Sequence, residues 1–178
     1  MLDKKIYGIM EIMNTIKYGY KDKFGNNIID INPNKWENEF NNFYRLLTPD
    51  ELLKTKCGIC WDQVELERKL FDDNNIGCKT FFIYIKDKDM LPSHTFLTYE
   101  NNNKYFWFEH SWSKYKGIHE YETLFDLLLD VQNKFKKDYS DVDESATLYL
   151  YEYKKPKHSI SCNEFYEYIE TQELIDFN

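Results

Sequence analysis

Three runs rich in aromatic and β-branched residues follow one another between residues 78 and 109. They are CKTFFIYIK (78–86), HTFLTYE (94–100) and KYFWFE (104–109). Runs of this kind predict β-strands, and the Asn-rich segment between the last two predicts a tight turn, because asparagine tolerates positive φ angles. The chain is therefore expected to build an antiparallel sheet in its middle, on which its other segments must pack.

Segments with apolar residues at helical spacing lie on both sides of these runs, and several begin with a capping-box pattern. The predicted helices are residues 3–17, 36–47, 48 to about 57, 60 to about 73, 123–135 and 161–169. Residues 146–153 predict one more strand, whereas 18–34 and 110–121 predict loops, the first with room for a short hairpin. Helices followed by an antiparallel sheet with an inserted helix predict an α+β fold.

The length of 178 residues fits one domain of ordinary size. A hydrophobic fraction of 42% is enough for a core, and an aromatic fraction of 18% makes that core rich in Tyr and Phe. We expect a single domain over residues 1–178. In it, an N-terminal helical portion, residues 1–47, precedes a catalytic-like core of about residues 48–155.

Charge and hydropathy restrict the expected partners and location. The net charge is -8, and an acidic chain gains nothing from the release of phosphate counterions, so we expect no nucleic-acid partner. No stretch approaches the roughly 20 apolar residues that cross a bilayer, so we expect no membrane partner. The first twenty residues do not look like a signal peptide, which predicts a cytoplasmic protein with reduced cysteines.

Cys60 follows Gly58 and Ile59 at the predicted start of a helix. The positive end of a helix dipole stabilises a thiolate, which is the nucleophilic form of cysteine. This position alone is a weak indication, because a cysteine at a helix start is more often a small buried hydrophobe. Cys78, at a strand start, and Cys162, in a helix cap, are most simply structural.

His94 opens the second strand, and the hairpin geometry gives it a partner. With a two-residue turn at Asn101 and Asn102, cross-strand pairing places His94 directly opposite Glu109. A carboxylate beside an imidazole can hold one ring nitrogen protonated and leave the other free to act as a base. Because Glu109 shares a strand face with Trp107, we expect a half-buried carboxylate rather than an edge charge in water.

Three segments together resemble the transglutaminase-like superfamily, which has a papain-like cysteine fold. They are GICWDQVELERKLF (58–71), SHTFLTYE (93–100) and KYFWFEHSW (104–112). The resemblance covers roughly residues 55–112. It implies a nucleophile helix packed on an antiparallel sheet, here with additional N- and C-terminal helices. It also implies that Cys60 is the nucleophile, His94 the base and Glu109 the orienting acid.

The third position departs from the pattern that the resemblance implies. The superfamily usually has Asp there, whereas this chain has Glu109 followed by His-Ser-Trp. Glutamate is longer by one methylene and can still reach a histidine. For the oxyanion, the backbone N–H of Cys60 is one candidate donor. The indole N–H of Trp36 is another, although a core role is favoured for that side chain.

Cys57 and Cys60 offer a rival interpretation, because Cys-x-x-Cys has the spacing of zinc ligands and four histidines are present. No second cysteine pair or closely spaced histidine pair follows, so the zinc-finger pattern is absent. A redox dithiol is also disfavoured, because no thioredoxin-like βαβ pattern surrounds the motif. We therefore expect neither a bound metal nor another cofactor.

The resemblance implies a cysteine-dependent acyl-transfer enzyme that acts on an amide bond of a protein or peptide substrate. Water as the acceptor makes it a hydrolase, and an amine makes it a transferase. The alternative is a binding module that kept the fold and lost turnover. In that case aromatic side chains, including Trp112, Tyr115 and Tyr121, would form its binding surface.

Overall fold

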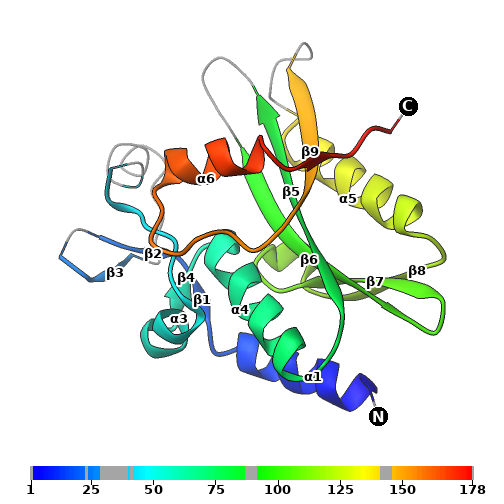
Figure 1. The fold of residues 1–178 in the computed structure, drawn as a ribbon, viewed down its shortest axis with the longest axis horizontal. Coiled ribbons are helices and arrows are strands. Elements are labelled where there is room, and N and C mark those ends of the chain that lie inside the picture. Colours follow the sequence, from blue (N-terminus) through cyan, green and yellow to red (C-terminus); the bar gives the residue numbers. More distant parts are fainter. Residues whose placement is uncertain are drawn as a thin grey trace.

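The computed structural model describes residues 2–22, 24–28, 40, 42–86, 92–140 and 146–177. Its helices are α1 (Leu2–Met13), α3 (Pro49–Thr55), α4 (Cys60–Asp73), α5 (Leu124–Asp138), α6 (Cys162–Ile169) and a 3-10 turn, η1 (Ser113–Tyr115). The long strands are β5 (Cys78–Lys86), β6 (Ser93–Asn101), β7 (Lys104–Glu109), β8 (Gly117–Tyr121) and β9 (Thr147–Tyr153). With the short β10 (Glu173–Leu174) they form one antiparallel sheet in the order β10-β9-β5-β6-β7-β8 (Figure 1).

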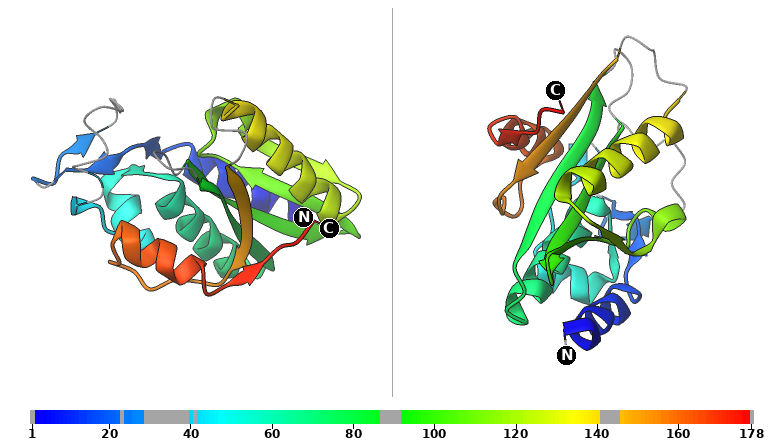
Figure 2. Two further views of the ribbon diagram at one scale, coloured as in Figure 1. Left: turned by 90° about the horizontal axis from the view of Figure 1, so that it is seen from above. Right: turned by 90° about the vertical axis from the view of Figure 1, so that its right-hand side faces the viewer.

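Two further pairs of short strands lie outside this sheet. β1 (Lys17–Tyr18) runs parallel to β4 (Cys57–Gly58), and β2 (Tyr20–Lys21) forms a small hairpin with β3 (Asn27–Ile28). Figure 2 shows α5 on one face of the main sheet, with α4 and α6 on the other. The predicted α+β fold, with a helix that begins at Cys60 packed on an antiparallel sheet, is confirmed.

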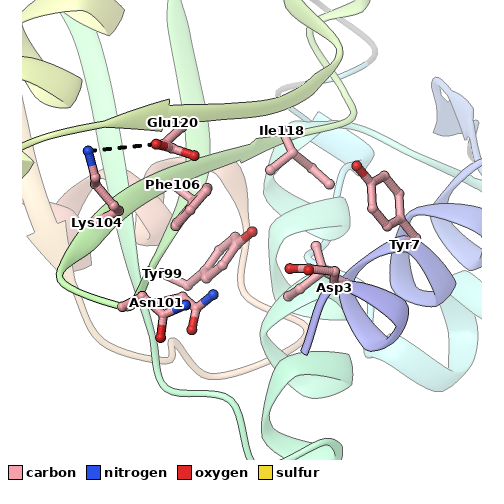
Figure 3. A pocket seen from close by; sticks show the side chains of 10 residues that line it. Asp3, Tyr7, Tyr99, Asn101, Lys104, Phe106, Ile118 and Glu120 are labelled. Carbon is pink, nitrogen blue, oxygen red and sulfur yellow. Dashed lines mark ion pairs between the residues drawn. The ribbon is translucent and has the colours of Figure 1, made fainter. Parts of the chain in front are cut away.

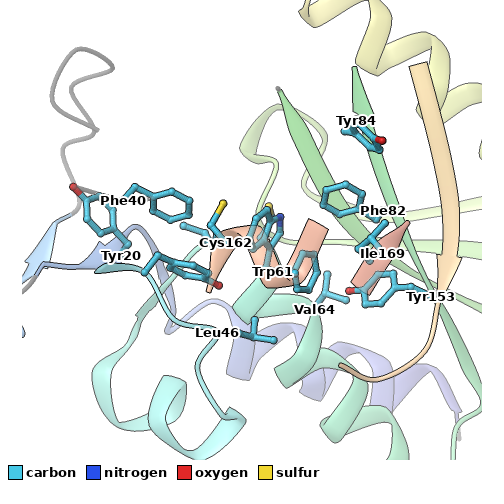
Figure 4. Packing of buried hydrophobic residues seen from close by; sticks show 14 of the residues in the cluster. Tyr20, Phe40, Leu46, Trp61, Val64, Phe82, Tyr84, Tyr153, Cys162 and Ile169 are labelled. Atoms are coloured by element: carbon cyan, nitrogen blue, oxygen red, sulfur yellow. The ribbon is translucent and has the colours of Figure 1, made fainter. Parts of the chain in front are cut away.

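The core reflects the aromatic composition of the chain. On the α4 side, the Trp61 ring stacks on Phe165 of α6 with ring centroids 4.3 Å apart, and Phe82 of β5 packs against both. Figure 4 shows Trp61 and Phe82 within this cluster. On the α5 side, Phe96 and Trp107 pack beneath that helix. Rings of this size bury much apolar surface, so both faces of the sheet are well covered.

Two predicted segments differ from the structure. Residues 110–121 were predicted as a loop, but they contain η1 and strand β8, which pairs with β7 along its whole length. The sequence signal there is weak because polar residues interrupt the strand, and pairing with a neighbour supplies what local propensity does not. Of the predicted helix at 36–47, residues 36–39 and 41 lie outside the described residues, 40, 42 and 43 are helical, and 44–47 are not. Among the described residues, no helix is long and apolar enough to span a membrane.

Candidate active site

The start of α4 is fixed by a buried carboxylate. Ile59, the residue before the helix, has no polar side chain to cap it, and its backbone N–H donates to Asp62 Oδ2 at 2.9 Å. Asp62 Oδ1 accepts from the Tyr44 hydroxyl at 2.8 Å and from the backbone N–H of Leu47 at 2.9 Å. Burial raises the pKa of Asp62 to about 7 despite these hydrogen bonds. Asp62 therefore holds the turn that presents Cys60.

Gly58 allows the chain to enter this helix closely. A Cβ atom there would lie 2.6 Å from Leu52 Cδ1 and 2.9 Å from Asp62 Cβ, so a larger residue would displace the turn. The Gly58 carbonyl accepts two hydrogen bonds, from Gln63 Nε2 at 2.8 Å and from the backbone N–H of Gly19 at 3.3 Å. The turn before Cys60 is thus attached both to its own helix and to the N-terminal segment.

The hairpin turn falls one residue later than predicted. Asn102 and Asn103 have φ angles of 53° and 59°, and Asn101 pairs with Lys104. The register is therefore shifted by two residues, and the prediction that His94 lies directly opposite its acid partner is wrong. Consecutive asparagines permit the turn at either position. An even shift keeps every side chain on its predicted face.

His94 and Glu109 meet diagonally across the two strands. The His94 Nε2 N–H donates to Glu109 Oε2 at 2.8 Å, and the two residues are 7% and 2% exposed. The carboxylate also accepts from Trp107 Nε1 at 3.2 Å, Ser111 Oγ at 3.2 Å and the Trp112 backbone N–H at 2.7 Å. Glu109 is therefore fully buried rather than half-buried, and four donors fix its orientation.

The Cys60 thiol lies near the His94 ring, since its hydrogen bonding and charge are among the causes that raise the pKa of that ring. Since Nε2 is bound to Glu109, Nδ1 is the ring nitrogen left for the thiol. Burial lowers the pKa of His94, but the charge of Glu109 and the hydrogen bonds to Cys60 and Glu109 outweigh it and raise that pKa to about 10. The ring is then an imidazolium at neutral pH.

The other three cysteines lie in environments that disfavour ionisation. Burial raises the pKa of Cys57, and it raises the pKa values of Cys78 and Cys162 to about 11 each. All four cysteines belong to the described residues and are free thiols. Among the four, Cys60 is the cysteine that lies near the His94 ring and the Tyr18 hydroxyl.

Two neighbours of the site had no signal in the sequence. The Tyr18 hydroxyl lies 4.0 Å from Cys60 Sγ. One turn along α4, Gln63 Oε1 accepts a hydrogen bond from His110 Nδ1 at 2.6 Å. Burial, and to a smaller extent the charge of Lys116, lowers the pKa of His110 to about 4. Both contacts join segments that are far apart in the chain, so no local sequence pattern predicts them.

Other expected features lie elsewhere or outside the description. In the alternative of a binding module, Trp112, Tyr115 and Tyr121 would form the binding surface, but they are only partly exposed and pack against the core beneath α5. Their apolar rings gain more from that packing than from contact with water. Trp36 lies outside the described residues. Within the part of the chain that is described, no group of three or more His, Cys, Asp or Glu could hold a metal ion.

A separate cavity of about 410 Å³ lies between α1 and the outer strands (Figure 3). Asn101 and Asn102 line one end of it, and Lys104 and Glu120 form an ion pair at 3.8 Å on another side. The cavity is at the turn end of the β6–β7 hairpin, whereas His94 lies at the opposite end. It is therefore distinct from the Cys60 site.

Comparison with known families agrees with the fold. Residues 2–140 match the family described as the transglutaminase-like domain. The chain belongs to this transglutaminase-like family. A comparison with curated proteins gave no match. The family match also includes the N-terminal helix, which lay outside the 55–112 segment on which the resemblance first rested.

Proposed function

We propose that this protein is a cysteine-dependent acyl-transfer enzyme in which Cys60 is the nucleophile, His94 the proton carrier and Glu109 the orienting acid. One observation carries the proposal: a single imidazole ring is hydrogen-bonded to the buried carboxylate of Glu109 and lies near the Cys60 thiol, which is among the causes of its raised pKa. This is the arrangement that nucleophilic catalysis requires, with a base beside the nucleophile and a third group that orients the base.

The chemistry follows from these contacts. The Cys60 thiolate forms a bond to the carbonyl carbon of an amide, and the carbonyl π electrons move to its oxygen. When the tetrahedral intermediate collapses, the C–N bond breaks, and the leaving amine takes a proton from the His94 imidazolium. Water or a second amine then attacks the thioester while neutral His94 accepts its proton, and Cys60 leaves as the thiolate.

We further propose that the amide belongs to a protein or peptide. Cys60 is 3% exposed, so the scissile group must reach it on a slender part of the substrate. Tyr18 and Tyr139 are 38% and 37% exposed; the Tyr18 hydroxyl lies 4.0 Å from Cys60 Sγ, and the charge of Cys60 contributes to the raised pKa of Tyr139. Exposed aromatic rings near the thiol are suited to contact the apolar parts of a polypeptide.

The test uses p-nitrophenyl acetate as an activated acyl donor. Wild-type protein is expected to release a burst of p-nitrophenol and to carry one acetyl group on Cys60, located by peptide mass spectrometry. Cys60→Ala should lose both signals, whereas Cys162→Ala should keep them, because burial raises the pKa of the Cys162 thiol. Turnover with and without added glycine ethyl ester then distinguishes an amine acceptor from water.

The result that contradicts the proposal is equally definite. If folded wild-type protein leaves Cys60 unmodified, or if Cys60→Ala retains the burst, Cys60 is not the nucleophile. Absence of labelling in a folded protein would favour the alternative of a fold that binds without turnover.

A further inference from the structure

Tyr18 is held beside the nucleophile loop by backbone pairing. In the parallel β1–β4 pair, Tyr18 lies opposite Gly58, two residues before Cys60. On either side of it, the N–H of Lys17 donates to the Lys56 carbonyl at 2.9 Å and the N–H of Gly19 to the Gly58 carbonyl at 3.3 Å. The position of Tyr18 is therefore tied to the same turn that presents the sulfur.

The two ends of the Tyr18 side chain have different surroundings. The residue is 38% exposed, yet its hydroxyl reaches inward to within 4.0 Å of Cys60 Sγ. Burial of the hydroxyl raises the pKa of Tyr18 well above 10, and the charge of Cys60 and the hydrogen bond to it raise it further. The hydroxyl consequently keeps its proton and can donate a hydrogen bond at any pH at which the enzyme would work.

We propose that the Tyr18 hydroxyl is a catalytic residue of the acyl-transfer reaction, donating a hydrogen bond to the oxyanion of the tetrahedral intermediate. The inference rests on the proposed function of Cys60. The oxyanion forms on the carbon that is bonded to Sγ, so a donor already in contact with Sγ needs only a small movement to reach it. The backbone N–H of Cys60, at the N-terminus of α4, is suited to be the second donor.

Two reactions at the same sulfur separate this role from a simpler one. Acetylation by p-nitrophenyl acetate passes through a tetrahedral oxyanion, whereas alkylation by iodoacetamide is a direct displacement of iodide at a saturated carbon and forms none. An oxyanion donor accelerates only the first reaction. A hydroxyl that merely stabilises the Cys60 thiolate affects both reactions in parallel.

The experiment compares both rates in wild type, Tyr18→Phe and Lys17→Ala. Phe keeps the ring and removes only the hydroxyl, and Lys17→Ala changes an exposed neighbour on the same strand. We expect Tyr18→Phe to slow acetylation of Cys60 by about 10²-fold and to change alkylation by less than about threefold. Lys17→Ala is expected to leave the ratio of the two rates unchanged. Because both reagents modify one sulfur, any change in the reactivity of that sulfur that is common to the two reactions cancels in this ratio.

An unchanged ratio in Tyr18→Phe would overturn the inference. If both rates change equally, Tyr18 acts on the thiolate, and if neither changes, its role is structural; in both cases the proposed function of Cys60 stands. If wild-type Cys60 resists acetylation altogether, the proposed function itself fails, and the inference fails with it.

Discussion

The two faces of the β6–β7 hairpin bury one histidine each, at the same end of the sheet. His94 faces α5, His110 faces α4, and both are 7% exposed. Each ring has a close side-chain partner: the carboxylate of Glu109 at 2.8 Å for His94, and the amide oxygen of Gln63 at 2.6 Å for His110. The two residues are thus matched in burial and differ mainly in the charge of the partner.

The acid dissociation constants of the two rings nevertheless differ by many orders of magnitude. Burial lowers the pKa of both rings, but the Glu109 charge and the hydrogen bonds raise the pKa of His94 to about 10. At His110, burial and the charge of Lys116 prevail over the more weakly felt Glu109, and the pKa falls to about 4. A buried histidine is therefore charged or neutral according to its partner. The same sheet end can hold a charged imidazolium on one face and a neutral imidazole on the other.

Glu109→Gln should have the largest effect, because it removes the difference in partner charge between His94 and His110. Without the negative charge, burial dominates at His94, and its pKa is expected to fall below 6.5 as it does at His110. Acetylation of Cys60 should slow by about 10²- to 10⁴-fold, because an amide no longer stabilises the imidazolium or sets its tautomer. NMR titration of the ring and burst kinetics measure the two effects. The free energy of unfolding should also drop by about 1–3 kcal/mol, because Gln cannot accept from all four donors.

Glu120→Gln is the matched control for this change. The Glu120 side chain is 60% exposed on β8, so losing its charge should leave acetylation and the His94 titration unaltered. A Glu109→Gln protein in which His94 still titrates near pH 10 would show that the carboxylate does not set the charge of the ring.

Gln63→Glu should sharpen the comparison by giving His110 an anionic partner as well. The pKa of His110 is expected to rise from about 4 to above its ordinary value of 6.5. The Gly58 carbonyl loses its Gln63 donor, which should cost about 1 kcal/mol of unfolding free energy. Gln63→Met, which is neutral and cannot accept strongly, is the control in which the pKa of His110 stays low. If NMR finds the same low value in Gln63→Glu, the partner-charge explanation is wrong.

The smallest effect concerns stability in acid. The depressed pKa of His110 gives stability that is present above pH 6.5 and is lost as the pH falls through about 4. The raised pKa of Asp62 acts oppositely: its stability is present below about pH 3.8 and is lost as the pH rises through about 7. The two contributions partly cancel between pH 4 and 6.5. The free energy of unfolding of the wild-type protein should therefore change little in that range because of these two groups.

His110→Asn removes one side of this balance. Relative to wild type, its free energy of unfolding should improve by about 2 kcal/mol as the pH falls from 7 to 4, with the full shift discounted for partial solvation of the ring. Urea unfolding at several pH values measures the difference. A difference that is constant with pH would mean that His110 has an ordinary pKa.

The hairpin half of the site could be predicted because its information is local. Strand periodicity placed His94 and Glu109 on one face, and that assignment is correct even though the turn lies at Asn102 and Asn103. Which pair of consecutive asparagines forms the turn was undetermined, because both positions accept positive φ. The helix start at Cys60 was likewise readable from its sequence.

The remainder of the site depends on tertiary contacts that produce no periodic pattern in the sequence. Tyr18 reaches the sulfur through two-residue strands, which are too short to show an alternating pattern. Trp112 looked like a surface aromatic, but its ring meets the His94 ring with centroids 4.9 Å apart. The fate of such side chains is decided by tertiary packing, which a single sequence does not specify.

The Gly58 carbonyl, with one hydrogen bond to the N-terminal segment, limits how far the chain can be shortened. A truncation beginning at Thr48 would remove Gly19 and Tyr18 from this turn. It would also strip α1 from the apolar surface that includes Leu66 and Phe71 and leave that surface open to aggregation. The sheet and nucleophile helix alone are therefore a poor fragment for dissection, and the smallest useful one must retain α1 and β1.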